Sequence, residues 1–347
     1  MPLNYSEEQS LLRDAARDFF ATTLPVSNLR ALRDQNNETG YCTEAWQAMI
    51  DLGWGGITIP EEFGGLGFGY KGLGVILEQA GRTLAASPLL ATCVLGVTAL
   101  VEGGSPECKK ALLPLVVDGK VALALAVDEN PVHAPYDIAC KAVKEGSSYM
   151  LSGQKIFVLD GHVANELIVV ARTSGDTASR DGITLFLVNA KSAGISYNRS
   201  VMVDSRNACR INFDEVSVAA TQVLGTVDQG AELLDFILDV GRICLSAEML
   251  GGLQEAFDRT IEYLKTREQF DVKIGSFQGL QHRAARMFCE VELAKSVVIA
   301  ALTALDDGVD RTDIAEHASL AKAKVSEVFK LVSNEAIQMH GGIGTTD

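Results

Sequence analysis

The sequence predicts an α+β fold in three parts: an N-terminal all-helical domain, a central antiparallel β domain and a C-terminal four-helix bundle. Two observations support this prediction. Apolar residues recur at helical spacing over the first third of the chain and again after residue 231. Between these parts, short apolar runs alternate with Gly, Asp, Asn and Ser, which is the pattern of strands and turns. We therefore place the domains at residues 1–119, 120–230 and 231–347.

The N-terminal domain begins with a helix. Ser6 and Gln9 have the spacing of a capping box, in which each side chain bonds the backbone N–H of the other residue. Apolar residues then repeat at helical spacing through Phe20. A further helix ends near Gly53, and after a glycine-rich loop we expect an apolar helix over 75–84 and more helix to about residue 117.

The central domain is predicted to be a sheet. Runs such as VALALAVDE, ELIVVAR and GITLFLVNA have the length of strands and are rich in β-branched residues. Since no long helical stretch separates them, a parallel βαβ sheet is not expected and an antiparallel sheet or barrel is favoured. In the last domain, helical periodicity over roughly 231–264, 277–306 and 313–339 predicts long antiparallel helices joined by short turns.

Composition excludes several classes of function. The net charge of −15 argues against nucleic-acid binding, which needs a basic face. The seven cysteines are dispersed without a CxxC pair or Cys/His cluster, so we expect no metal site and a reducing compartment. No signal peptide or apolar run of about 18 residues is present, so we expect a soluble cytoplasmic protein without a membrane span.

The stretch GFGYKG, residues 67–72, matches the spacing GxGxxG. Dinucleotide binding through this motif requires a strand directly before it and a helix beginning on it. The preceding residues, PEEFGGL, do not have the pattern of a strand. We therefore favour a glycine-rich loop between helices.

Two stretches near the C-terminus have stronger functional indications. In TREQFDVKIGSFQGLQH, Arg267 and Gln278 are placed at neighbouring helix ends, where a guanidinium group and a helix N-terminus can hold phosphate. In IQMHGGIG, three glycines follow Gln338 within a few residues, which suggests close approach of the backbone to a ligand or another subunit. An ordinary helical hairpin and a helix cap remain alternatives for these two stretches.

Taken together, these stretches resemble the acyl-CoA dehydrogenase family over essentially the whole chain. The resemblance is carried by YSEEQSLLRDAARDFF, LGWGGITIPEEFGGLG, SGQKIFVLDG, the long block from GAELLDFILD to GSFQGLQH, and AIQMHGGIG. It implies a helical domain, a β domain and a four-helix bundle. It also implies α,β-dehydrogenation of an acyl-CoA thioester with FAD, and an electron-transfer flavoprotein as electron acceptor.

In this family FAD lies across a subunit interface, so the resemblance implies a homo- or heterotetramer. The flavin ring sits on the β domain of one subunit, where Phe157 keeps an aromatic face. Asp239 and Arg242 match positions that line the acyl-CoA site. The pyrophosphate and adenosine are held by the neighbour, and the matching residues here are Arg267, Gln269, Phe270, Phe277, Gln278, Gln338, Gly341 and Gly342.

This sequence departs from the family pattern at two sites. The loop over the flavin ring, usually Thr-Glu-Pro…Gly-Ser-Asp, reads DENPVHAPYD here, and Leu159 replaces a hydroxyl residue. The commonest position of the catalytic Glu lies beyond Asp347, and the minority position is Gly241. Glu248 lies two turns farther along the helix and is predicted to point elsewhere. The catalytic base therefore remains unassigned.

Two functions follow from these departures. The chain is either a catalytic acyl-CoA dehydrogenase or a non-catalytic, half-site subunit that completes the FAD site of a related partner. A pure interaction protein without redox function is a third alternative, and it predicts no bound flavin. The kept interface residues agree with both functions, and the altered ring loop agrees with the second. Because most members of the family are enzymes, we favour the first.

Overall fold

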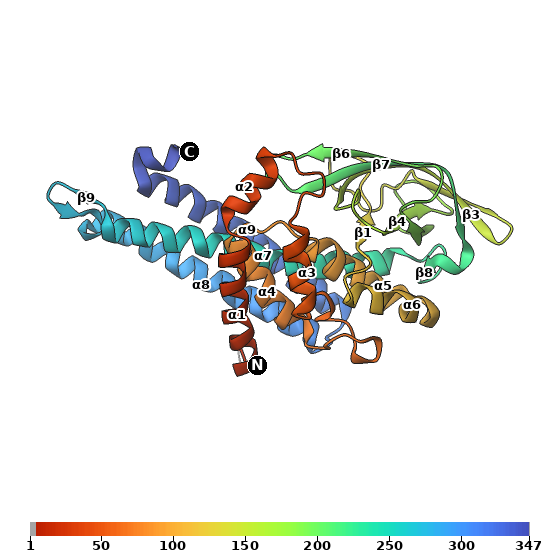
Figure 1. The fold of residues 1–347 in the computed structure, drawn as a ribbon, viewed down its shortest axis with the longest axis horizontal. Coiled ribbons are helices and arrows are strands. Elements are labelled where there is room, and N and C mark those ends of the chain that lie inside the picture. The colour runs from red at the N-terminus through yellow and green to blue at the C-terminus, as the bar shows by residue number, and fades with distance from the viewer. Residues whose placement is uncertain (1–4, 347) are drawn as a thin grey trace. The chain divides into compact units, whose positions relative to one another are not determined.

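The computed structural model describes residues 5–346, which form two compact units (Figure 1). The first unit contains residues 5–28, 69–85 and 242–346, and the second contains residues 29–68 and 86–241. The α-helices are α1 (Glu7–Thr23), α2 (Val26–Asp34), α3 (Thr43–Asp51), α4 (Gly69–Arg82), α5 (Val97–Gly103), α6 (Pro106–Val117), α7 (Ala231–Thr266), α8 (Gln278–Asp306) and α9 (Arg311–His340). A π-helix, η3 (Leu89–Gly96), precedes α5.

The first unit is a helical bundle. The predicted capping box begins α1, since the Gln9 N–H donates to Ser6 Oγ at 3.1 Å and the Ser6 N–H donates to Gln9 Oε1 at 3.0 Å. Ion pairs Arg283–Glu335 and Lys324–Glu290, each 2.5 Å, show that α8 and α9 run antiparallel. Helix α4 packs on both α1 and α8. The predicted C-terminal bundle is confirmed, and an N-terminal helix contributes to its packing.

Helices α4 and α7 touch through their backbones. A Cβ atom at Gly81 would lie 1.9 Å from the carbonyl oxygen of Glu248, and one at Gly251 would lie 1.8 Å from that of Glu78. Only glycine permits this approach, because a larger residue at either position would collide with main-chain atoms. The contact fixes which face of α7 points toward α4.

The GxGxxG stretch does not form a dinucleotide-binding turn. It is preceded by two 3₁₀ turns, η1 (Trp54–Gly56) and η2 (Glu61–Phe63), and α4 begins within it at Gly69. The N-terminus of α4 is bound by a carboxylate of the protein itself: Asp306 accepts the N–H of Tyr70 at 2.5 Å and that of Lys71 at 3.1 Å. The site that would take a phosphate in a dinucleotide fold is thus occupied by Asp306.

The second unit contains an eight-stranded sheet. Its strands are β1 (Leu123–Ala126), β2 (Lys141–Glu145), β3 (Ser148–Leu159), β4 (Glu166–Arg172), β5 (Ile183–Asn189), β6 (Ile195–Val201), β7 (Asn207–Ala219) and β8 (Val223–Leu224). They pair in the order β6-β7-β3-β2-β4-β5-β8, and β1 pairs with β4. The predicted antiparallel sheet is confirmed, with two parallel exceptions that the sequence did not indicate, β1/β4 and β2/β4.

Strand β4 is buried on both of its faces, as its alternate residues show. Leu167 and Val169 belong to a core enclosed by strands, whereas Ile168 and Val170 face a core shared with η3, α5, α6 and the start of α7. Strand β4 is therefore apolar throughout rather than alternating. The second core brings the beginning of α7 against the sheet, which positions the residues described below.

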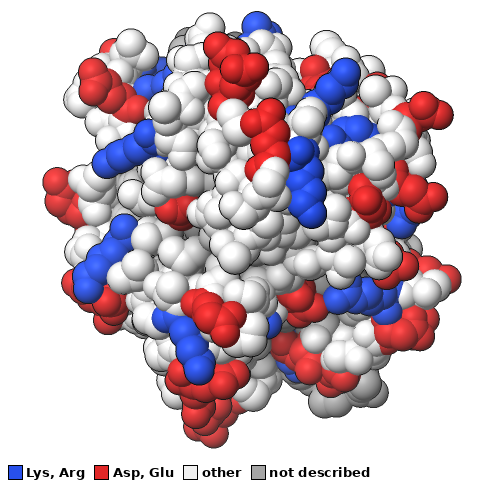
Figure 2. Space-filling view, turned by 90° about the vertical axis from the view of Figure 1, so that its right-hand side faces the viewer, with Lys and Arg blue, Asp and Glu red and all other residues white. Residues whose placement is uncertain are grey.

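Charged side chains are interspersed on the face shown in Figure 2. The basic side chains there are separated by acidic and uncharged ones, so this face has no continuous basic surface. Within residues 5–346, no helix has the length and apolarity needed to cross a membrane.

Candidate functional site

The turn between α7 and α8 carries the first group of predicted site residues. Strands β9 (Glu268–Gln269) and β10 (Val272–Lys273) form a small hairpin, and Phe270 at its tip has a φ of 57°. The Ile274 N–H donates to the Arg267 carbonyl at 2.9 Å, which brings the end of α7 close to the start of α8 at Gln278. Arg267 and Gln278 therefore lie at adjacent helix ends, as the sequence predicts.

The side chains of this hairpin are presented outward. Phe270 is 86% exposed and Phe277 40% exposed, and their rings meet edge to face with centroids 6.4 Å apart. Arg267 is exposed, and its guanidinium makes no hydrogen bond or ion pair with any residue that the structure describes. Exposed aromatic faces beside an available guanidinium group suit a ligand that is both planar and anionic.

The glycine-rich stretch after α9 lies beside the same helix end. His340 stacks on Tyr263 with ring centroids 4.4 Å apart, and Tyr263 accepts the N–H of Arg267 through its carbonyl oxygen at 2.8 Å. A Cβ atom at Gly341 or Gly342 would meet no heavy atom within 4 Å, although Gly341 has a φ of 62°. These glycines therefore border open space instead of relieving a crowded contact. The α7–α8 turn and the end of α9 both lie at the left of Figure 1, and the stacked rings of Tyr263 and His340 join α7 to the end of α9.

Phe157 marks the second predicted site, in the second unit. Its φ is 53°, and the pairing of β3 with β7 shifts register between Lys155 and Val158. A positive φ is strained for a bulky residue, so the surrounding sheet must hold this bulge in place. The result is an aromatic side chain that is 50% exposed, directly before the buried Val158.

The loop 127–140 corresponds to the family's loop over the flavin ring. It is held in place by a buried ion pair. Lys155 is fully buried and donates to Glu129 Oε1 at 2.6 Å and to the Val127 carbonyl at 2.9 Å. Glu129 also accepts the N–H groups of Ala139 and Cys140, at 2.7 and 3.1 Å. Burial lowers the pKa of Lys155, and Glu129 opposes this shift. Glu129 is thus engaged in holding the loop and is not an available base.

The minority position for a catalytic Glu is occupied by Gly241 and crowded by one flexible side chain. A Cβ atom at Gly241 would lie 2.7 Å from Leu95 Cδ2, on the π-helix η3. A glutamate side chain would need Leu95 to move. Asp239 lies two residues earlier on α7 and is buried, with 7% of its surface exposed.

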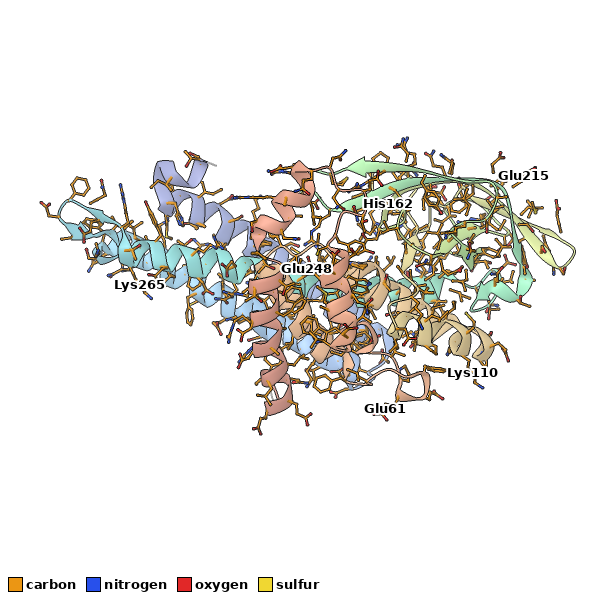
Figure 3. All side chains as sticks on the ribbon, viewed as in Figure 1. Glu61, Lys110, His162, Glu215, Glu248 and Lys265 are labelled. Carbon is orange, nitrogen blue, oxygen red and sulfur yellow. The ribbon has the colours of Figure 1, made fainter. Side chains whose placement is uncertain are left out.

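Glu248 lies on the other side of α7. It follows Asp239 by nine residues, which is two and a half turns of an α-helix, and its carbonyl oxygen packs against Gly81 of α4. Figure 3 labels this residue among the helices. The expectation that Glu248 points elsewhere than position 241 stays a prediction, since the contact of its carbonyl oxygen does not fix the direction of its side chain.

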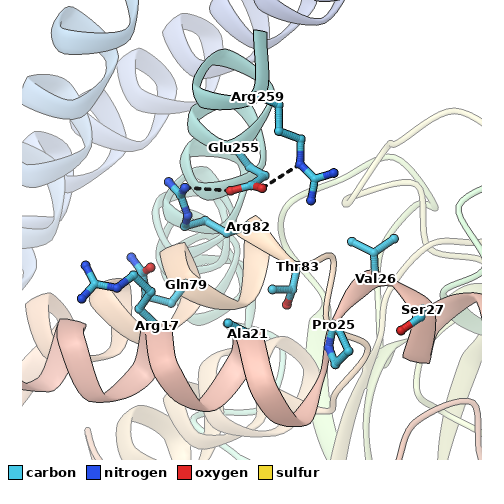
Figure 4. Close-up of a pocket in the computed structure, with 10 residues that line it drawn as sticks. All are labelled: Arg17, Ala21, Pro25, Val26, Ser27, Gln79, Arg82, Thr83, Glu255 and Arg259. Carbon is cyan, nitrogen blue, oxygen red and sulfur yellow. Dashed lines mark hydrogen bonds and ion pairs between the residues drawn. The ribbon is translucent and has the colours of Figure 1, made fainter. Parts of the chain in front are cut away.

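A cavity of about 460 Å³ lies in the first unit between α1, α4 and α7 (Figure 4). Three arginines line it, but each already has an acidic partner. Arg82 contacts Glu255 at 2.7 Å and Asp258 at 2.8 Å, Arg259 contacts Glu255 at 2.7 Å, and Arg17 lies 3.2 Å from an aspartate one turn earlier on α1. These pairs balance the positive charge, so the cavity is not a strong candidate for an anion site.

One polar group in the second unit was not indicated by the sequence. Arg172, 6% exposed, donates to the carbonyl oxygens of residues 136, 138, 177, 179 and 181. It thereby joins the loop 127–140 to the loop between β4 and β5. The only available signal was an arginine that ends the apolar run ELIVVAR.

Comparison with known proteins identifies the family. Residues 6–120 match the acyl-CoA dehydrogenase N-terminal domain, residues 134–216 the middle domain and residues 228–347 the C-terminal domain. The chain is 32% identical to mitochondrial isovaleryl-CoA dehydrogenase of Pongo abelii, over 98% of this chain and 81% of that protein. It is 29% identical to the caffeyl-CoA reductase-Etf complex subunit CarC of Acetobacterium woodii, over 98% and 89%.

Solved structures are similar over nearly the whole chain. A steroid ACAD superposes with a TM-score of 0.85 at 34% identity, covering 98% of this chain and 88% of that one. The ChsE4-ChsE5 complex from Mycobacterium tuberculosis superposes with a TM-score of 0.86 at 27% identity, covering 100% and 90%. The matched domains, their order and these similarities show that the chain belongs to the acyl-CoA dehydrogenase family, whose enzymes are oxidoreductases acting on CH–CH bonds.

Proposed function

We propose that this chain is an FAD-dependent acyl-CoA dehydrogenase that carries out α,β-dehydrogenation of an acyl-CoA thioester. The observation that supports this proposal most strongly is the surface formed by the α7–α8 turn and the end of α9. It gathers an arginine, three glutamines, two exposed phenylalanines and two glycines that border open space, as a nucleotide cofactor requires. This composition is unusual for a protein surface with no ligand to bind.

The residues of this surface fit the pyrophosphate and adenosine of FAD. Arg267 would bind the pyrophosphate, and the N-terminus of α8 at Gln278 favours negative charge. Phe270 and Phe277 would pack on the cofactor and exclude water. Gln269 and Gln338 offer amide groups, and Gly341 and Gly342 admit the cofactor to the backbone. When bound, FAD would supply the acceptor for the hydride that leaves the β carbon.

For the substrate, we propose Asp239 and Arg242 on α7 as lining residues, with Phe157 of β3 on the side of the flavin ring. Asp239 is nearly buried, so its contacts are preorganised. A carboxylate that removes the α proton completes the reaction, and the described residues place none at position 241. We further propose an electron-transfer flavoprotein as electron acceptor, since one relative is named as a subunit of an Etf complex.

A half-site subunit is the second candidate function. The minority position for the base is a glycine that Leu95 crowds, and Glu129 is paired with Lys155. In such an assembly this chain would hold the adenosine end of FAD for a partner of the same family. One similar structure is a complex of two proteins, ChsE4 and ChsE5.

The FAD content of the purified protein separates these two functions. The chain is produced alone and together with a related family subunit, and the flavin absorbance is compared with the protein concentration. About one FAD per chain, bleached by an acyl-CoA, supports the complete enzyme. Absence of flavin in the isolated chain with about one FAD per heterodimer supports the half-site subunit. Absence of flavin in both preparations contradicts both functions.

Arg267→Ala tests the proposed pyrophosphate contact. Loss of a charge-assisted hydrogen bond should weaken FAD binding by about 1.5–3 kcal/mol, which is roughly 10- to 100-fold. The exposed Arg30 on α2 serves as the control, and Arg30→Ala should leave FAD binding unchanged. Equal FAD affinity in both variants would contradict the assignment of Arg267.

A further inference from the structure

Three segments of the second unit meet at a polar cluster that we call the Tyr136 junction, formed by Tyr136, Arg180 and Asp235. Tyr136 belongs to the loop 127–140, Arg180 to the loop between β4 and β5, and Asp235 to the second turn of α7. No motif in the sequence connects these residues, since Tyr136 and Asp235 are 99 positions apart.

The three side chains contact one another in every pairwise combination. The Tyr136 hydroxyl donates to Asp235 Oδ1 at 2.5 Å, and Arg180 Nη2 contacts Asp235 Oδ2 at 2.6 Å. Arg180 also donates to the Tyr136 hydroxyl, and its guanidinium carbon lies 4.6 Å from the centre of the Tyr136 ring. Both oxygens of Asp235 therefore have a partner, and Arg180 uses its planar fork on both of the other residues.

An exposed ion pair alone would contribute little. The side chains of Arg180 and Asp235 are 50% and 32% exposed, and such pairs are commonly worth less than about 1 kcal/mol. The Tyr136 junction differs because the ring of its third member, Tyr136, is partly buried and packs against the apolar core that includes the beginning of α7. Burial and the carboxylate of Asp235 together raise the pKa of Tyr136, so its hydroxyl stays a donor.

The loop 127–140 and the loop between β4 and β5 are also joined by hydrogen bonds to backbone carbonyl groups. Arg172 donates to the Tyr136 carbonyl at 2.9 Å and to the Thr177 carbonyl at 2.7 Å, and the Ile138 N–H donates to the Thr177 carbonyl at 2.9 Å. Movement of either loop therefore carries the other with it. The Tyr136 junction connects this pair of loops to the side of α7 through charged groups.

On α7, Asp235 precedes Asp239 by four residues, so the two carboxylates lie one above the other on the same helical face. Asp239 is a proposed substrate-lining residue, and Arg242 follows at the next helical step. The Tyr136 junction thus stands at the N-terminal end of the face along which the thioester would lie.

We propose that Tyr136, Arg180 and Asp235 are positioning residues for acyl-CoA binding. They hold the loop 127–140 against the beginning of the substrate-lining face of α7, so the loop is in place before the substrate arrives. This inference rests on the proposed function for the identity of the ligand. It goes beyond that function by assigning affinity for the CoA ester to three residues that do not belong to the proposed cofactor surface.

The test uses the FAD-loaded protein, with its partner subunit where FAD requires one, and the probes CoA and octanoyl-CoA. The variants are Tyr136→Phe, Arg180→Gln and Asp235→Asn. Tyr197→Phe removes a hydroxyl that bonds only the Ala190 carbonyl, and Arg210→Gln removes an exposed guanidinium from β7, so both are matched controls. Amide hydrogen exchange of residues 131–139 reports on the loop independently of ligand binding.

Each junction variant is expected to weaken binding of the CoA ester roughly tenfold, and to raise KM more than it lowers kcat. Exchange at residues 131–139 should rise, and binding of the CoA ester is compared per bound FAD so that loss of cofactor is separated from loss of substrate affinity. Tyr136→Phe combined with Asp235→Asn should weaken binding by less than the two single effects added as free energies, because the two residues share one contact. Arg180→Lys should fall between the wild type and Arg180→Gln, since lysine keeps the charge but not the fork.

The outcomes separate this inference from the proposed function. If the wild type bleaches with octanoyl-CoA and the junction variants behave like the two controls, the positioning role is wrong and the proposed function stands. If the variants weaken binding and free the loop but the flavin is never bleached, the positioning role stands and dehydrogenation of this probe by the chain is wrong. If the wild type binds neither CoA nor octanoyl-CoA, both are overturned.

Discussion

At the scale of single residues, Gly241 shows how one missing side chain limits the chemistry of the site. Its hydrogen atom faces Leu95, and a Cβ atom here would lie 2.7 Å from Leu95 Cδ2, so Leu95 would have to shift. We expect Gly241→Ala to lower the free energy of unfolding by about 1–3 kcal/mol through overpacking. Adding Leu95→Ala removes the crowding, so the second substitution should cost less in the Gly241→Ala background than in the wild type. Urea unfolding of the four proteins measures these free energies.

Gly279 provides the control for this substitution. It lies in the first turn of α8, and a Cβ atom there would meet nothing within 4 Å. Gly279→Ala should therefore be neutral or slightly stabilising, because alanine favours the helix. Equal destabilisation by Gly241→Ala and Gly279→Ala would show that the contact with Leu95 is not tight.

Asp160 predicts a pH dependence of stability. Burial raises the pKa of this carboxyl to about 6, although the Asn207 amide donates to it at 3.0 Å. The unfolded chain binds the proton more weakly, with a pKa of about 3.9. The stability that Asp160 contributes is therefore present at pH values below the unfolded pKa and is lost as the pH rises through about 6.

Asp160→Asn removes this titration and keeps an acceptor for Asn207. Relative to wild type, the variant should gain stability between about pH 5 and pH 8, on the order of 1–2 kcal/mol. Urea unfolding of both proteins at the two pH values measures the difference, in which contributions of other groups cancel. A stability difference that is independent of pH would contradict the assignment.

At the scale of elements, the start of α4 depends on a residue from the end of α8. Asp306 bonds two backbone N–H groups there and meets the positive end of the helix dipole. Asp306→Ala should lower the free energy of unfolding by about 0.5–2 kcal/mol. The neighbouring exposed Asp307 makes no such bond, and Asp307→Ala is the control that should change stability by less than about 0.5 kcal/mol.

The loop 127–140 depends on the buried pair of Glu129 and Lys155. Glu129→Gln leaves a buried ammonium group without a charged partner and should cost about 3–5 kcal/mol. Adding Lys155→Met should restore most of that loss, because an apolar pair can replace a buried ion pair. Glu145→Gln, on the exposed side of β2, controls for loss of a carboxylate. If the double variant is less stable than Glu129→Gln, the ion pair is not the reason for the loss.

Elements with strong local signals could be predicted from the sequence, and those set by distant partners could not. The capping box of α1 and the three long C-terminal helices follow from local spacing. Helix α4 begins six residues before the predicted start, because glycines hide its periodicity and its N-terminal partner, Asp306, is 236 residues away. The parallel pairing of β1 with β4 and the Tyr136 junction likewise arise only when distant segments meet.

The same division applies to the candidate site. Arg267, Gln278 and Gln338 stand in recognisable motifs, so their neighbourhood at one end of the first unit was predictable. Two other features were not predictable: the contact of Leu95 with position 241 and the ion pair between Glu129 and Lys155. Each depends on packing between elements that carry no shared motif.

At the scale of the whole molecule, the central claim is that this chain takes part in FAD-dependent oxidation of acyl-CoA thioesters. The most direct measurement adds an acyl-CoA anaerobically to the flavin-loaded protein and follows the flavin absorbance. The proposal predicts bleaching by a saturated acyl-CoA, with appearance of the α,β-unsaturated thioester in equal amount. A flavin-loaded protein whose absorbance stays unchanged with short, long, branched and steroid-derived acyl-CoA thioesters would contradict it.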